Sequence, residues 1–282
     1  MKISLIVRTL NEEGNINHCL TCISRQTLVP DEVLVVDNES TDRTIEIVRG
    51  FSNILNIKII SNPIKGYASG LNLGYSHASH EIIGFLSADC FPEPDWLKHM
   101  ALALIKYDCA VVQGTEIHHF EKEYREIDDI NFVIRETRPE IKRDGKITFF
   151  NNTNIVYRRA ALEKHIPFKG IGKENGAEDT IMSIRFKKSN YIAIQSCSAR
   201  VIHTAYESSD DFKKRTISQG RRLCKFLYLF PLHPRTYLNP FYWSLIEFAY
   251  FFKTGNTKFI KTSFLRIFYI LKGIIESSLL VS

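Results

Sequence analysis

The sequence VLVVDNESTD at residues 33–42 decides the fold, because it joins a strand to a helix through a polar turn. Its first four residues form a short apolar run of the kind that builds a buried strand, and Asp37 ends this run. Residues 40–42, Ser-Thr-Asp, are typical of a helix start, where a hydroxyl caps the first turn and an acid lies near the positive end of the helix dipole. We therefore predict a strand, a turn and a helix capped by the serine or the threonine.

The same design recurs on both sides of this stretch. Apolar runs at 3–7, 57–60 and 82–86 predict three more strands, and helical patterns at 16–23 and 67–78 lie between them. Continuous apolar strands that alternate with helices are typical of a parallel sheet that is covered on both faces. The chain is therefore predicted to be an α/β protein.

Polar residues stand at three of these strand ends. Arg8 and Thr9 end the first strand, Asp37 follows the second and Asp89 follows the fourth. Ligands of such sheets bind beyond the carboxyl ends of the strands. We expect these side chains to converge at one edge and to contact a ligand there.

The second half of the chain is less regular. Residues 120–145 form a charged stretch without clear periodicity, which we interpret as a surface insertion or a mobile loop. Order returns at 147–157, and a helix start follows at 158–162. A second helix is predicted at 178–188 and a strand at 191–202, which ends at His203.

Charge divides the chain into two parts. Residues 212–282 hold 12 Lys and Arg against two Glu, a net charge of +10, whereas residues 1–211 carry 25 − 29 = −4. We predict a domain over 1–210 and a basic, amphipathic helical extension over 211–282 with an anionic partner. No helix-turn-helix, zinc finger or aromatic RNA-binding motif accompanies the basic residues, so nucleic acid is not an expected partner.

Cysteine spacing and the N-terminus indicate the compartment. The six cysteines include one CxxC pair, at 19 and 22, without a second pair at zinc spacing, which favours reduced structural thiols. The first apolar run has only five residues, fewer than the core of a signal peptide requires. A cytoplasmic location is expected.

Five motifs in a fixed order carry a resemblance to a known family. They are TLNE at 9–12, VVDNESTD at 35–42, FLSADC at 85–90, Glu178-Asp179, and His203. Together they resemble the family 2 glycosyltransferases, which have the GT-A fold, a Rossmann-like mixed and mainly parallel sheet flanked by helices. The resemblance covers residues 1–205. It implies an inverting transfer of a sugar from a nucleoside diphosphate to a hydroxyl of a glycan or lipid-linked acceptor.

The resemblance also implies a nucleotide-sugar pocket. A carboxylate at a strand end, such as that of Asp37, can accept hydrogen bonds from a base N–H or a ribose hydroxyl. Asp42 is explained equally well as a helix-starting acid, and the glycines of residues 65–70 as the turn before a helix. The pocket residues implied are Thr9, Asn11, Glu12, Asp37, Asn38, Asp42, Lys65, Gly66, Ser69, Asn154 and Arg222.

Arg222 lies in the sequence QGRRL at 219–223, which partly resembles the Gln-x-x-Arg-Trp of processive relatives. Leu223 replaces the tryptophan, so a processive enzyme is not predicted. A basic helix face is the alternative explanation of this segment.

The metal site departs from the family pattern. The family usually has Asp-x-Asp where this chain has Ser87-Ala88-Asp89, and a hydroxyl is a poorer ligand for a hard cation than a carboxylate. We expect a weakly held divalent cation, Mn²⁺ or Mg²⁺, at Asp89 and His203. In the alternative interpretation Asp89 caps the next helix, His203 is structural, and basic residues neutralise the leaving group.

The resemblance makes Asp179 the catalytic base and Glu178 its neighbour. An inverting transfer needs one base to take the proton of the acceptor hydroxyl. An acidic helix start is also common for dipole reasons alone. Residues 151–154, Asn-Asn-Thr-Asn, resemble the family segment that faces the donor sugar and the acceptor.

Two other classes of protein are compatible with parts of the sequence. Ser87 raises the possibility of a degenerate nucleotide-sugar or lipid-binding protein without turnover. A sugar nucleotidyltransferase would need a Gly-rich N-terminal loop, and residues 8–14 hold a single glycine. The leading prediction is a glycosyltransferase of bacterial surface-polysaccharide synthesis that transfers a hexose or deoxyhexose. Residues 86–90, LSADC, are similar to rhamnosyltransferase-type sequences.

The tail suggests a membrane surface. Residues 258–276 place Lys258, Lys261, Thr262, Arg266, Tyr269, Lys272 and Glu276 on one helix face and large apolar residues on the other. Such a helix lies flat on an anionic membrane. The resemblance adds that relatives which build surface glycans use polyprenyl-linked acceptors, so a peripheral place on the inner face of the membrane is expected. Alternatively the helix covers the catalytic domain or forms a homodimer.

Overall fold

The computed structural model describes residues 1–64, 66–118, 142–170, 177–203, 212–214, 216–218, 220 and 234–278. The described residues of 1–117 and 142–203 form one compact unit, and those after 203 form another. Each unit is treated by itself below. Most of the predicted insertion at 120–145 lies outside the described residues.

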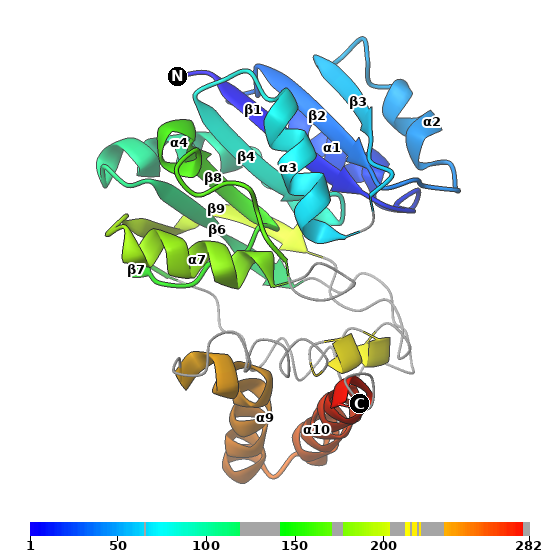
Figure 1. The fold of residues 1–282 in the computed structure, drawn as a ribbon, viewed down its shortest axis with the longest axis vertical. Coiled ribbons are helices and arrows are strands. Elements are labelled where there is room, and N and C mark those ends of the chain that lie inside the picture. Colours follow the sequence, from blue (N-terminus) through cyan, green and yellow to red (C-terminus); the bar gives the residue numbers. More distant parts are fainter. Residues whose placement is uncertain are drawn as a thin grey trace. The chain divides into compact units, whose positions relative to one another are not determined.

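The first unit is built on a mixed sheet, drawn in Figure 1. Strand β1 is parallel to β2 and β4, and β2 is parallel to β3, whereas β8 is antiparallel to both β4 and β6. The strand order is β3 (Ile57–Ser61), β2 (Glu32–Asp37), β1 (Ile3–Thr9), β4 (Ile82–Ser87), β8 (Asn154–Arg158), β6 (Val111–His118), β9 (Ala193–His203) and β5 (Cys90–Pro92), with β7 (Gly145–Ile147) beside β9.

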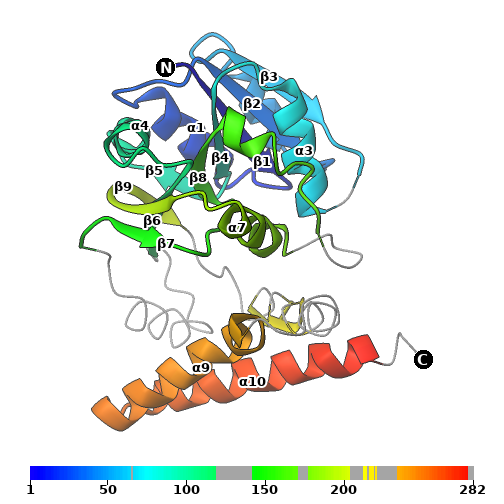
Figure 2. The ribbon, with the colours of Figure 1, turned by 60° about the vertical axis from the view of Figure 1, so that its left-hand side comes forward.

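Helices cover both faces of this sheet (Figure 2). Leu5 and Val7 of β1 belong to one buried cluster and Ile6 to another, because successive side chains of a strand face opposite sides. One cluster is completed by α1 (Ile16–Ser24), α2 (Thr44–Arg49) and α4 (Trp96–Lys106), and the other by α3 (Tyr67–His77), α6 (Arg159–Leu162) and α7 (Glu178–Lys188). Burial of both faces explains why the strands have continuous apolar sequences.

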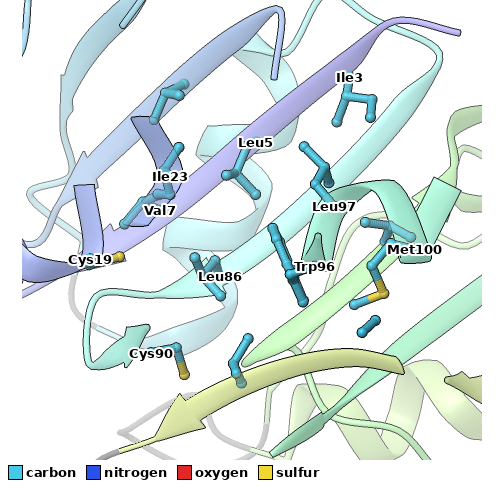
Figure 3. Packing of buried hydrophobic residues seen from close by; sticks show 14 of the residues in the cluster. Ile3, Leu5, Val7, Cys19, Ile23, Leu86, Cys90, Trp96, Leu97 and Met100 are labelled. Atoms are coloured by element: carbon cyan, nitrogen blue, oxygen red, sulfur yellow. The ribbon is translucent and has the colours of Figure 1, made fainter. Parts of the chain in front are cut away.

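Trp96 lies at the centre of the first cluster (Figure 3). It is fully buried, and its indole Nε1 donates a hydrogen bond of 2.7 Å to Asn154 Oδ1. Two cysteines, Cys19 and Cys90, pack in the same cluster, and the five cysteines of the described residues are all free, as expected of reduced thiols.

Strand register brings the polar strand ends to one edge. Thr9 pairs with Asp37, and Asp37 pairs with Ser61, so the ends of β1, β2 and β3 lie level. On the other side of β1, Arg8 pairs with Ser87. Cys90 of β5 pairs with His203 of β9, so His203 lies at the same edge of the sheet.

The second unit contains two long helices, α9 (Pro234–Thr254) and α10 (Thr257–Ser278), joined through Gly255 in a left-handed conformation with φ +69°. The helices pack together around a buried ion pair, in which Arg266 Nη2 lies 2.7 Å from Glu247 Oε1. Within the part of the chain that the structure describes, we find no helix with both the length and the hydrophobicity of a membrane span.

The packing of α10 corrects the predicted helix faces. Arg266 and Thr262, both expected on the polar outer face, are buried together with Phe259 and Ile270. The side that remains exposed is an apolar stripe, which we define as Phe264, Phe268, Leu271 and Ile275. The exposed lysines Lys261 and Lys272 flank it. The predicted apolar face is therefore divided between the interior and the surface.

Candidate active site

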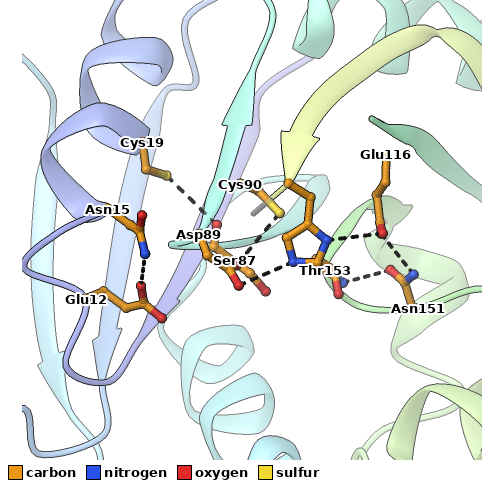
Figure 4. A network of polar contacts seen from close by, with 10 residues as sticks. Glu12, Asn15, Cys19, Ser87, Asp89, Cys90, Glu116, Asn151 and Thr153 are labelled. Carbon is orange, nitrogen blue, oxygen red and sulfur yellow. Dashed lines mark hydrogen bonds and ion pairs between the residues drawn. The ribbon is translucent and has the colours of Figure 1, made fainter. Parts of the chain in front are cut away.

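An imidazole lies between two carboxylates at the sheet edge (Figure 4). His203 ends β9; its Nε2 lies 3.3 Å from Asp89 Oδ2 and its Nδ1 lies 3.3 Å from Glu116 Oε2. Burial by itself would lower the pKa of His203, but the hydrogen bonds and negative charges of Asp89 and Glu116 outweigh burial and raise this pKa to about 10. The three side chains form one ionic cluster.

Glu116, at the end of β6, was missed by the sequence analysis. Its Oε1 accepts a hydrogen bond of 3.0 Å from Asn151 Nδ2, and Asn151 Oδ1 accepts one of 3.0 Å from the Thr153 backbone N–H. Asn151 belongs to the segment expected to face the sugar. The rule that singled out Asp37 and Asp89, an acid at the carboxyl end of a strand, also applies to Glu116.

Asp89 and His203 can serve as metal ligands once the imidazole gives up its Nε2 proton, because only the neutral ring binds a metal. One ligand atom from each of Asp89, Cys90 and His203 lies within 4.8 Å of the others. Carboxylate and imidazole suit Mn²⁺, whereas a thiol is a soft ligand, and burial followed by the charge of Asp89 raises the pKa of Cys90 well above its ordinary value. Glu116 would then orient the imidazole through its second nitrogen.

Asp89 does not cap a helix, so the alternative interpretation of this residue is wrong. The chain after Asp89 continues into β5, and α4 begins only at Trp96, after Asp95. The Asp89 carboxylate instead contacts His203 and accepts a weak hydrogen bond of 3.9 Å from Cys90 Sγ.

The turns after β1 and β2 interlock at the other end of the edge. The Asp37 carboxylate is buried and accepts hydrogen bonds from the backbone N–H and the hydroxyl of Ser40, the latter at 2.5 Å. The Asn11 N–H donates to Ser40 Oγ at 2.9 Å, and Asn11 Oδ1 accepts from the Thr41 N–H at 2.8 Å. Asn11 and Asp37 are therefore in one network, as expected for one pocket.

A second set of amides extends this network to α3. Asn38 Nδ2 donates to the Thr9 carbonyl at 3.2 Å, and Asn38 Oδ1 accepts from Asn62 Nδ2 at 2.6 Å. Asn62 Nδ2 also reaches Ser69 Oγ at 3.1 Å. Gly66, just before α3, has φ +118°, a conformation that favours glycine. Thr9, Asn38, Gly66 and Ser69 are thus brought together.

Asp42 and Glu12 have local roles. Asp42 Oδ1 accepts from the N–H of Thr44, the first residue of α2, at 3.0 Å, and its Oδ2 accepts from the Glu13 N–H at 3.1 Å. Asp42 therefore forms a turn with the residue two positions on, just ahead of α2. The N-cap residue of α2 is Arg43 without a side-chain capping bond, so the predicted cap by the hydroxyl of residue 40 or 41 is wrong. Glu12 Oε2 accepts from Asn15 Nδ2 at 2.8 Å, ahead of α1.

Asn154 does not lie with the pocket. Its side chain is fully buried, bonded to Trp96 and packed against Gly114, where an added Cβ would come within 2.5 Å of Asn154 Nδ2. Such a side chain has no surface to offer a ligand, so we leave it out of the site. Lys65 and Arg222 lie outside the described residues.

Glu178 and Asp179 open α7, as the sequence predicts. Asp179 Oδ1 accepts from the Thr180 N–H at 2.6 Å, and the Phe150 N–H donates to Ser183 Oγ at 3.1 Å, one turn further along the helix. This contact ties the start of α7 to the residue before Asn151. The helix that these acids open is therefore joined to the residue before Asn151, which bonds Glu116.

Comparison with known proteins adds to this geometry. The model of the family described as "Glycosyl transferase family 2" matches residues 4–166, which are 163 of the 282 residues. The chain belongs to glycosyl transferase family 2. Like other members it has the expected GT-A fold: a mannosyltransferase from Pyrobaculum calidifontis, solved with GDP-Man and Mn²⁺, superposes with a TM-score of 0.68 at 19% identity, covering 98% of this chain and 86% of that one.

Two curated relatives illustrate the range of this glycosyl transferase family. Glycosyltransferase AglE of Haloferax volcanii is 40% identical over 100 residues, 34% of this chain and 33% of AglE. The O-antigen chain rhamnosyltransferase RfbN of Salmonella typhimurium is 26% identical over 226 residues, 76% of this chain and 70% of RfbN. The chain spans between 15% and 55% of the length of the first three curated relatives that it matches.

Proposed function

We propose that the chain is an inverting glycosyltransferase that moves a hexose or deoxyhexose from a nucleoside-diphosphate sugar to a hydroxyl of a glycan or polyprenyl-linked acceptor. The observation that carries this proposal is that the Asp37 turn and the Asp89–His203–Glu116 cluster lie on one sheet edge. In the proposal, the acids that open α7 supply the base. Similarity to RfbN supports a role in the synthesis of a surface polysaccharide.

Each group has a role in this proposal. The turns around Asp37, Asn11 and Asn38 bind the nucleoside through hydrogen-bond acceptors and amides. Asp89 and His203 would hold a divalent cation, Mn²⁺ or Mg²⁺, which supplies positive charge to the diphosphate leaving group. Glu116 orients the His203 ring and so fixes the nitrogen that faces the cation.

Asp179 is the proposed base. Inversion needs a single carboxylate on the side of the sugar away from the leaving group, where it takes the proton of the acceptor hydroxyl as that oxygen attacks the anomeric carbon. Glu178, buried beside it, adds negative charge that favours proton uptake. Burial, then the charges of Asp179 and Glu178, raise the pKa of the Tyr157 phenol on β8.

The proposed function is tested with nucleoside diphosphates and nucleotide sugars in a thermal-shift panel, each with and without Mn²⁺. A ligand at a hundred times its dissociation constant should stabilise the protein by about 2.7 kcal/mol. Turnover of the best nucleotide sugar, with the anomeric configuration of the product read by NMR, then distinguishes an inverting enzyme from a binding protein. Tight binding without turnover on any acceptor would favour the degenerate binder that Ser87 suggests.

We further propose that residues 211–282 form a helical extension that holds the enzyme against the inner face of the membrane. The apolar stripe of α10 and its flanking lysines, Lys261 and Lys272, support this proposal, because exposed apolar residues beside basic ones bind anionic lipid surfaces. A homodimer through the same stripe is the competing outcome.

A further inference from the structure

Two arginines of the first unit stack on tyrosine rings and differ in their hydrogen bonds. The Arg159 guanidinium carbon lies 5.1 Å from the centroid of the Tyr75 ring, and its Nε and Nη2 donate to backbone carbonyls at 2.6 and 2.7 Å. The Arg8 guanidinium carbon lies 5.3 Å from the centroid of Tyr67. Among the described residues the side chain of Arg8 has no hydrogen bond or ion pair, although its Nε is buried. The buried Nε–H therefore lacks an acceptor within the protein, while the rest of the half-buried guanidinium is open to a ligand.

Arg8 stands between the two halves of the site. In the sheet it is opposite Ser87, and its carbonyl accepts a hydrogen bond of 3.3 Å from the Ala88 N–H, in the turn that leads to Asp89. A Cβ added to Gly70 would lie 3.5 Å from both Arg8 Cδ and Asn38 Oδ1, so the arginine stem and the Asn38 amide share the surface of this glycine.

We propose that Arg8 binds the diphosphate of the donor, an inference that rests on the proposed function. In a nucleoside-diphosphate sugar the diphosphate joins the nucleoside to the sugar, so it must span from the Asn38 side of the site to the Asp89 side. Arg8 lies in that interval. Its planar fork of N–H donors matches phosphate oxygens, and Tyr67 holds the fork in place through its ring.

The position of Arg8 also explains why a serine, and not an acid, suits position 87. Residues paired in parallel strands carry their side chains on the same face, so an acid at position 87 would stand beside Arg8 and neutralise it. With a serine there, the positive charge of Arg8 is available to the substrate. The loss of one potential metal ligand and the presence of one unpaired arginine are thus parts of a single arrangement.

Calorimetric titration tests this assignment. Binding of UDP, GDP and dTDP to the wild type is first measured with and without Mn²⁺. The diphosphate that binds most tightly and its nucleoside are then titrated into wild type, Arg8→Ala, Arg8→Lys and Arg49→Ala. Arg8→Ala should weaken diphosphate binding by about 10- to 100-fold, the range for hydrogen bonds to charged groups, and leave nucleoside binding unchanged. Arg8→Lys should be intermediate, because lysine keeps the charge without the fork. Arg49→Ala, the same charge change at an exposed position on α2, should bind like wild type.

Thermal unfolding of the same variants shows whether a loss of binding comes from a loss of folding. Arg8→Ala should melt close to wild type, whereas Arg159→Ala should melt lower and keep its diphosphate affinity, because only Arg159 is bonded to the backbone. If wild type binds a diphosphate and Arg8→Ala binds it equally tightly, the role of Arg8 is wrong and the proposed function stands. If wild type binds none of the three, with or without Mn²⁺, both are wrong.

Discussion

The two units of the chain distribute apolar and charged side chains in opposite ways. In the first unit, large apolar residues such as Trp96 and Phe85 are fully buried between sheet and helices. Its ionic groups Asp89, His203 and Glu116 lie at the sheet edge, half-buried. This is the arrangement of a protein that keeps an apolar core and places its chemistry at the surface.

The helices of the second unit reverse this pattern. Arg266 and Glu247 are only 3% and 1% exposed, whereas Phe252 is 82% exposed and the stripe residues Phe264 and Phe268 are 60% and 61% exposed. Charged groups are costly to bury and phenylalanines are costly to expose in water. The contrast supports the two proposals made above, a polar substrate for the first unit and a lipid surface for the second.

The largest expected effect is a loss of sugar transfer, the activity proposed for the first unit, without a loss of vesicle binding, the activity proposed for the second. Asp89→Ala removes the carboxylate proposed to hold the cation, so sugar transfer should be abolished while vesicle binding is unchanged. Ser87→Asp should strengthen the dependence on Mn²⁺, because it restores a second acid. Transfer assays over a Mn²⁺ titration check both variants. Full wild-type activity in excess chelator would show that the enzyme does not use a cation.

The next effect concerns the ion pair inside the second unit. Glu247→Ala leaves the Arg266 guanidinium buried without its carboxylate, which should cost about 3–5 kcal/mol of unfolding free energy. The double variant Glu247→Leu/Arg266→Met removes both charges and should be near wild type or more stable. Thermal and denaturant unfolding measure both. A single variant as stable as the wild type would mean that the pair is not buried in solution.

The smallest effect concerns the apolar stripe. Phe264→Ser/Phe268→Ser should reduce co-sedimentation with phosphatidylglycerol vesicles by about tenfold or more, since a buried phenylalanine contributes about 1.5–3 kcal/mol. Lys261→Gln or Lys272→Gln should each cost about 1 kcal/mol and matter less at high salt.

A matched control for the stripe lies in the first unit. Ile105 on α4 is 62% exposed, close to the values of the stripe, so Ile105→Ser should leave vesicle binding unchanged. Wild type that stays in the supernatant at low salt would contradict a membrane role. A dimer that the Phe264→Ser/Phe268→Ser variant dissociates would assign the stripe to a second copy of the chain.

Much of the first unit could be predicted from sequence, for a physical reason. Continuous, Val-rich apolar runs of four or five residues such as 33–36 are typical of strands buried on both faces, and each ends abruptly at a polar residue. The chain topology then puts those residues on one edge. The positions of Asp37 and Asp89 at that edge therefore follow from the sequence without knowledge of a single contact, and their roles in binding stay predictions.

The remaining features depend on packing, which periodicity does not encode. Asn154 was itself expected in the pocket, yet its side chain turns inward to Trp96, which needs a buried acceptor for its indole N–H. The faces of α10 were predicted as one polar and one apolar side, but a helical projection does not show which side a neighbouring helix covers. Glu116 precedes a stretch without periodicity, and so its strand end was not recognised.

The most direct test of the central claim, that the sheet edge is the active site of a glycosyltransferase, is single-turnover sugar transfer by Asp179→Asn. The asparagine keeps the shape of the side chain and removes the base, so turnover should fall by about 10²- to 10⁴-fold while nucleotide-sugar affinity stays near wild type. An Asp179→Asn variant with near wild-type turnover would contradict the account.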